Sequence, residues 1–94
     1  MNPPALTAPA ELCSSTARAW KERVARDITP LATETSVDLS KTRFIDSSGL
    51  GALLSLHKIL RTQGGILKLL NPSAAVSQLI ELTRLHRVFE IVHA

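Results

Sequence analysis

The stretch RFIDSSGLGALL, residues 43–54, decides the fold because it joins the end of a strand to the start of a helix. The apolar pair before the aspartate favours a strand, and Asp46 then offers a carboxylate that can cap a helix. Beyond Gly49, leucines recur at spacings of three and four, which is typical of an amphipathic helix. We therefore predict a helix from about residue 47 to about residue 62, ended by the glycine pair at 64 and 65.

Strands and helices alternate along the rest of the chain. Residues 14–16 offer a cap for the first helix and Pro30 helps to end it, while Ser73 offers a cap for the last one. The other predicted elements are an irregular strand at 10–12, a helix from residue 15 to about residue 28, strands at 36–39 and 66–70, a helix after residue 73 and a final strand at 87–92. This order predicts an α/β fold in which a parallel or mixed sheet of about four strands has helices packed mainly on one face.

Length and composition restrict the class of protein. With 94 residues, 45% of them apolar, the chain suits one domain with an aliphatic core. Its basic residues give a net charge of +3 but are scattered among few aromatics, so we expect no direct contact with nucleic acid. Cys13 is the single cysteine, which fits a reducing cytoplasm. We expect neither a secretory signal nor a membrane-spanning segment.

The adjacent serines at 47 and 48 raise the question of catalysis. A nucleophilic Ser47 needs a nearby base, yet the G-x-S-x-G pattern is missing and the three histidines show no informative spacing. The Gly-Leu-Gly at 49–51 lacks the third glycine of a dinucleotide loop, and neither a histidine pair nor a second cysteine suggests a metal site. We therefore predict no catalytic residue, no cofactor and no metal, and we expect His57 to be a packing residue.

A structural role explains part of the 43–54 stretch. Asp46 or Ser47 can accept a backbone N–H of the first helical turn, and Gly49 permits a close approach to the strand. One such cap would be enough, however, and two glycines leave the backbone bare at the helix start. The loop that leaves the carboxyl end of a strand is where partners usually meet an α/β fold. We therefore expect another molecule to pack closely here.

Four pieces of the sequence, taken together and in order, resemble the STAS domain of bacterial anti-sigma factor antagonists. They are VDLS, FIDSSGLGALL, the GG before ILKLLN, and LIELTRLHRVFEI, and the likeness covers residues 37–92. The resemblance implies a STAS-like fold. We expect residues 1–9 to be a loose, proline-rich terminus and residues 10–94 a single STAS domain. Longer members begin with two strands and a Gly-rich hairpin, so the N-terminal strand region is shortened here.

The resemblance also implies a function and a modified residue. In that family the first serine after the aspartate is phosphorylated by the partner, an anti-sigma factor that is also a serine kinase, and the matching residue is Ser47. The implied protein is a non-enzymatic, cytoplasmic anti-sigma factor antagonist that is monomeric when free. Unphosphorylated, it sequesters the anti-sigma kinase and releases a sigma factor; phosphorylated, it lets go.

Two further expectations follow from this resemblance. Short STAS proteins also resemble the cytoplasmic accessory subunit of bacterial phospholipid-transport ABC systems, so docking on a transporter ATPase without a phosphate is the alternative. A phosphate on Ser47 would stand at a helix start, where the helix dipole favours anions, so it should leave the fold intact.

A docking surface is predicted on the helix at 47–62. One of its faces carries small residues and a lysine and opposes the leucines, so we expect it to be exposed and flat enough to accept a helix of another protein. The predicted partner-binding residues are Asp46, Ser47, Ser48, Gly49, Leu50, Gly51, Ser55 and Lys58. Asp38, at the end of the preceding strand, is expected either to support the loop or to cap the turn that follows it.

Overall fold

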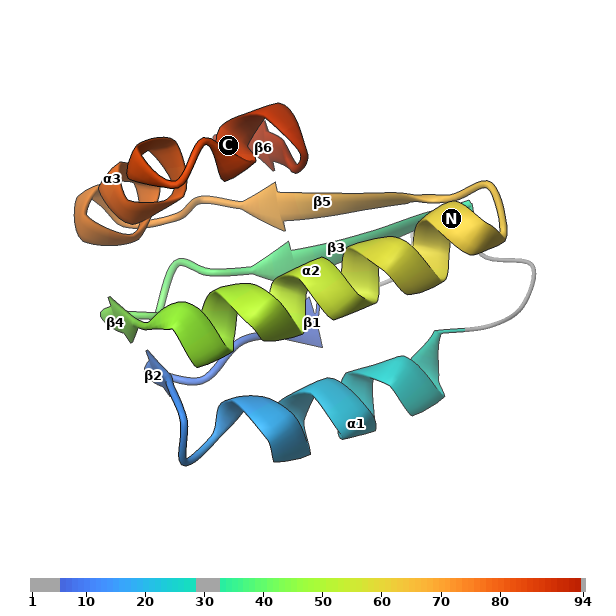
Figure 1. The fold of residues 1–94 in the computed structure, drawn as a ribbon, viewed down its shortest axis with the longest axis horizontal. Helices are drawn as coiled ribbons and strands as arrows, with labels where there is room; N and C mark the ends of the chain where they lie inside the picture. Colours follow the sequence, from blue (N-terminus) through green and yellow to red (C-terminus); the bar gives the residue numbers. More distant parts are fainter. Residues whose placement is uncertain (1–5, 29–32, 94) are drawn as a thin grey trace.

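The computed structural model describes residues 6–28 and 33–93, in which strands and helices alternate. The elements are β1 (Leu6–Thr7), β2 (Glu11–Leu12), α1 (Ala17–Asp27), β3 (Glu34–Asp38), β4 (Phe44–Ile45), α2 (Ser47–Thr62), β5 (Ile66–Leu70), α3 (Ala74–Leu82), the 3-10 helix η1 (Leu85–Arg87) and β6 (Glu90–Val92). Four strands form a parallel sheet in the order β1-β3-β5-β6, and a second parallel pair joins β2 to β4. Figure 1 shows α2 running across the front of the sheet, with α1 alongside it.

One face of the four-stranded sheet is covered by helices. Alternate residues of β3 and β5 are buried, as expected for strands with one covered face. The leucines of α2 that join this core are Leu50, Leu53, Leu56 and Leu60. On the opposite face, Nζ of Lys68 in β5 lies 3.0 Å from Oε1 of Glu34 in β3 and forms an ion pair with it. The hydrogen bond within this ion pair raises the pKa of Lys68. The α/β fold class predicted from the sequence is therefore confirmed.

The N-terminal region differs from its prediction. Residues 6 and 7, expected to belong to a loose terminus, pair with Val37 and Asp38 at the edge of the sheet. This edge is held further by α1, because Trp20 Nε1 donates a hydrogen bond to the carbonyl oxygen of Thr7 at 3.2 Å. The strand expected at 10–12 is present as β2, but it pairs with β4, outside the main sheet. β1 has only two residues, so it shows no periodicity from which the sequence could reveal it.

The middle of the chain agrees closely with its prediction. α2 covers residues 47–62 and β5 covers residues 66–70, as expected. Ser73 caps α3, since its hydroxyl accepts a hydrogen bond from the backbone N–H of Val76 at 3.3 Å. The strand expected at 36–39 begins two residues earlier and ends at Asp38.

The ends of two predicted elements are wrong. α1 begins at Ala17 rather than at residue 15. Thr16 does not cap it, because the Thr16 hydroxyl oxygen accepts the N–H of Cys13 at 3.0 Å, while the hydroxyl donates to the carbonyl oxygen of Glu11 at 2.7 Å. The strand expected at 87–92 is shortened to Glu90–Val92, since Arg84 takes a left-handed conformation with φ of 62° and η1 follows it. The predicted role of Pro30 lies outside the described residues.

Candidate functional site

Asp46 joins the start of α2 to the turn that precedes α1. Its Oδ1 atom accepts the N–H of Gly49 at 3.1 Å, which caps α2, and its Oδ2 atom accepts the N–H of Ser14 at 3.2 Å. The backbone N–H of Asp46 donates to the carbonyl oxygen of Leu12 at 3.3 Å. Because β2 pairs with β4, the loop before α2 is fixed by a segment far earlier in the chain.

Gly49 makes this close approach possible. A Cβ atom on Gly49 would overlap the carbonyl oxygen of Leu12 and would lie 2.6 Å from Cγ1 of Ile45. The predicted tight contact with a strand is therefore confirmed, although the strand contacted most closely is β2. Gly49 and Leu50 are both buried, so their side of α2 faces the interior of the protein. They position the loop from inside rather than offering surface to another molecule.

Ser47 and Ser48 lie on the outside of the same turn. Both are exposed, and neither hydroxyl forms a hydrogen bond with another residue in the described part of the chain. Ser47 is the first residue of α2, where backbone N–H groups and the helix dipole favour negative charge. The structure thus presents a free hydroxyl at a position that tolerates an anion.

The small-residue face of α2 borders a hollow between the two helices. We call this hollow the α1–α2 groove; its volume is about 340 Å³. Its lining residues are Ser14, Ala17, Arg18, Lys21, Ser48, Gly51, Ala52 and Ser55. A Cβ atom on Gly51 would meet nothing within 4 Å, so the missing side chain contributes directly to the hollow.

Two predicted partner-binding residues of α2 have distinct settings in this region. The Ser55 hydroxyl donates to the carbonyl oxygen of Gly51 at 3.0 Å, so it is engaged within the helix. Lys58 is exposed but does not line the α1–α2 groove.

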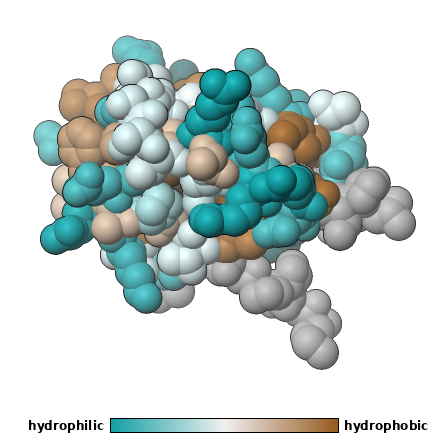
Figure 2. Space-filling view, turned by 90° about the horizontal axis from the view of Figure 1, so that it is seen from below, coloured by the Kyte–Doolittle hydropathy of each residue, from teal (hydrophilic) through white to brown (hydrophobic). Residues whose placement is uncertain are grey.

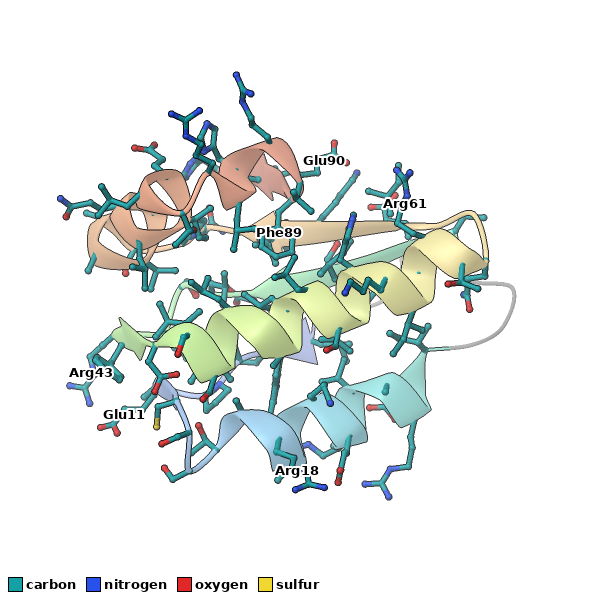
Figure 3. All side chains as sticks on the ribbon, in the orientation of Figure 1. Glu11, Arg18, Arg43, Arg61, Phe89 and Glu90 are labelled. Carbon is teal, nitrogen blue, oxygen red and sulfur yellow. The ribbon has the colours of Figure 1, made fainter. Side chains whose placement is uncertain are left out.

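The α1 side of the groove contributes residues that the sequence did not indicate. Arg18 and Lys21 are the charged residues that line it. Figure 3 shows the guanidinium of Arg18 pointing outward from α1, where its Nε atom lies 3.5 Å from Oε1 of Glu22 and both side chains are exposed. Figure 2 shows hydrophilic residues gathered over α1, beside a paler area where the chain enters the helix. No motif could have found these cations, because their role depends on how α1 lies against α2.

Asp38 caps the turn that follows β3, which is one of the two roles expected for it. Its Oδ1 atom accepts the backbone N–H of Ser40 at 2.8 Å and so caps the turn after β3. This hydrogen bond holds the pKa of Asp38 below its usual value. No hydrogen bond joins Asp38 to residues 46–49 in the described part of the structure.

Two further reactive side chains, His57 and Cys13, make local contacts. The imidazole of His57 packs edge-on against Phe89, with ring centroids 6.0 Å apart, and burial lowers its pKa, so the expected packing role is confirmed. Cys13 is a free cysteine whose pKa is lowered chiefly by a hydrogen bond with the Ser15 hydroxyl. Within residues 6–28 and 33–93 we find no cluster of three His, Cys, Asp or Glu side chains suited to a metal, and no helix there could cross a membrane.

Known proteins share this architecture. A family model, the STAS domain, matches residues 2–94. One similar structure is that of the anti-sigma factor antagonist SpoIIAA in its unphosphorylated form. Its sequence is 24% identical to this chain, and the two structures match with a TM-score of 0.79 over 94% of this chain and 76% of that chain. A second is the crystal structure of TM1081 from Thermotoga maritima, a proposed anti-sigma factor antagonist. Its sequence is 26% identical to this chain, and the TM-score is 0.82 over 93% of this chain and 75% of that chain. The sequence has no significant match among curated proteins.

Proposed function

The chain belongs to the STAS domain family, and from this premise we propose that it acts as an anti-sigma factor antagonist. In the unphosphorylated form it binds and sequesters an anti-sigma factor that is also a serine kinase, and a sigma factor is released. Phosphorylation of Ser47 by that kinase ends the complex. The protein serves as a kinase substrate and binding module in the bacterial cytoplasm, and not as an enzyme.

The setting of Ser47 carries this proposal. Its hydroxyl is exposed directly after the capping residue Asp46, whose carboxylate is held by Gly49 and Ser14. A kinase therefore meets a reachable acceptor on a loop whose shape is fixed in advance. A loop already ordered costs less to bind than one that must be ordered by the partner.

The phosphate acts on the partner and leaves the fold in place. It adds roughly two negative charges at the start of α2, where the dipole stabilises them. Asp46, Ser47, Ser48, Gly51, Ser55 and Lys58 form the outer part of the proposed docking surface, while Gly49 and Leu50 support it from inside. A Ser47→Asp variant should accordingly keep the thermal stability of the parent protein while binding the kinase less tightly.

Intact-protein mass spectrometry after expression in the native host tests the proposal. The parent protein and a Ser48→Ala control should both carry one phosphate adduct, and Ser47→Ala should carry none. Ser48 is the appropriate control because it is an adjacent, exposed serine in the same helical turn.

The opposite result would move the assignment to another class of protein. An adduct that persists in Ser47→Ala would exclude Ser47 as the acceptor. No adduct under any growth condition, together with an ATPase that co-purifies equally with the parent and with Ser47→Ala, would instead favour an accessory subunit of a phospholipid-transport ABC system.

A further inference from the structure

The α1–α2 groove is lined by two basic residues and by small residues, and phosphorylation of Ser47 alone does not require such a lining. We propose that it receives an acidic helical segment of the partner protein, selected by Arg18 and Lys21. This inference rests on the proposed function, because it specifies which chemistry the bound anti-sigma partner presents to the docking surface. The groove is part of that surface, since Ser48, Gly51 and Ser55 of α2 also line it.

The shape of the groove suits a helix that brings its backbone close. Ala17, Gly51 and Ala52 line it with little or no side chain, and the space above Gly51 is open. A volume of about 340 Å³ accommodates a few side chains of a docked helix. It is at the lower end of the range for drug-sized ligands.

The charge of the lining identifies the kind of helix. Arg18 and Lys21 are three residues apart, so they lie on one face of α1, and both line the groove without an acidic residue beside them there. The guanidinium of Arg18 lies at the outer edge of α1, where it contacts Glu22 at 3.5 Å and both side chains are exposed. Such surface pairs contribute little, so a carboxylate of a partner can replace Glu22 at low cost.

The position of Ser47 relates this groove to the switch. Ser48, the next residue, lines the groove, and so does Ser14, whose N–H is bound by Asp46. A phosphate on Ser47 therefore adds negative charge beside one end of the groove. An acidic segment in the groove would be repelled by that charge, which accounts for release on phosphorylation.

A peptide titration tests the groove directly. The isotope-labelled full chain is titrated with a capped, Glu-rich helical peptide and with a twin peptide in which Lys replaces each Glu, and amide chemical shifts are followed by NMR. We expect the acidic peptide, and not its twin, to shift the amides of groove residues. The pair Arg18→Glu with Lys21→Glu should weaken binding at least about tenfold, since each change replaces an attraction by a repulsion.

The matched control is the pair Arg23→Glu with Arg26→Glu. These arginines are exposed on the same helix, do not line the groove, and give the same change in net charge. Circular dichroism verifies that both double variants are folded. Equal shifts with the two peptides, or an equal loss of binding in the two double variants, would overturn the proposal.

A Ser47→Asp variant tests the relation to the switch in the same titration. Its affinity for the acidic peptide should fall, and an unchanged affinity would overturn the electrostatic account of release. Neither kinase nor phosphate takes part in the titration, so its failure would leave the proposed phosphorylation of Ser47 standing.

Discussion

Two glycines in the first turns of α2 have opposite surroundings. Gly49 lies on the inner side, where a Cβ atom would overlap the carbonyl oxygen of Leu12, whereas Gly51 borders the α1–α2 groove with open space above it. The same residue type thus serves packing at one position and leaves a surface hollow at the other. Bare backbone at a helix start is therefore not by itself a sign of a binding site, and the two cases separate only when the surrounding atoms are known.

The largest expected effect is on the inner side. Gly49→Ala forces a Cβ into the Leu12 carbonyl, and because that atom belongs to the backbone of β2 it cannot rotate away. We expect the free energy of unfolding to fall by about 1–3 kcal/mol or more, as for other overpacked sites. Urea unfolding followed by circular dichroism measures this loss. A loss below about 0.5 kcal/mol would show that β2 yields easily and that the contrast between the glycines is weak.

An intermediate effect is expected at the cap. Asp46→Ala removes the acceptors for Gly49 and Ser14, and loss of a helix cap costs about 0.5–2 kcal/mol. Asp46→Asn keeps one acceptor oxygen and should lose less than Asp46→Ala in the same urea measurement. Equal losses in both variants would mean that the charge of Asp46, rather than its two hydrogen bonds, stabilises the junction.

The smallest effect, and one of opposite sign, is expected on the groove side. Gly51→Ala adds a methyl group to open space in a helix interior, which should stabilise the protein by about 0.5–1 kcal/mol. Thermal unfolding should show the midpoint rising by several degrees. A lower midpoint would indicate that the groove is narrower than the structure shows.

Much of the fold could be predicted because its central elements have strong local signals. α2 and β5 are apolar runs with clear periodicity, bounded by Asp46, by the glycines at 64 and 65 and by the proline after β5. The cap by Ser73 was likewise evident from its place before an apolar helix. The family resemblance then directed attention to Ser47.

The remaining features depend on contacts between distant segments. The pairing of β2 with β4 joins residues more than thirty positions apart and involves strands too short to show a pattern. Thr16 was one of three residues expected to offer a cap for α1, but its hydroxyl oxygen accepts the N–H of Cys13 instead. The groove combines Arg18 and Lys21 of α1 with α2, so its charge could not be read from either helix alone.

The parallel strands also have a consequence for the rate of folding. Each neighbouring pair of strands in either sheet encloses a helix, so the described sheets contain no hairpin that could form early from local contacts. Chains dominated by such non-local contacts fold more slowly than helical bundles of the same length, because loop closure must precede any gain from pairing. The loop that carries Ser47 is completed only when β2 has met β4, so a nascent chain should acquire its phosphoacceptor geometry late.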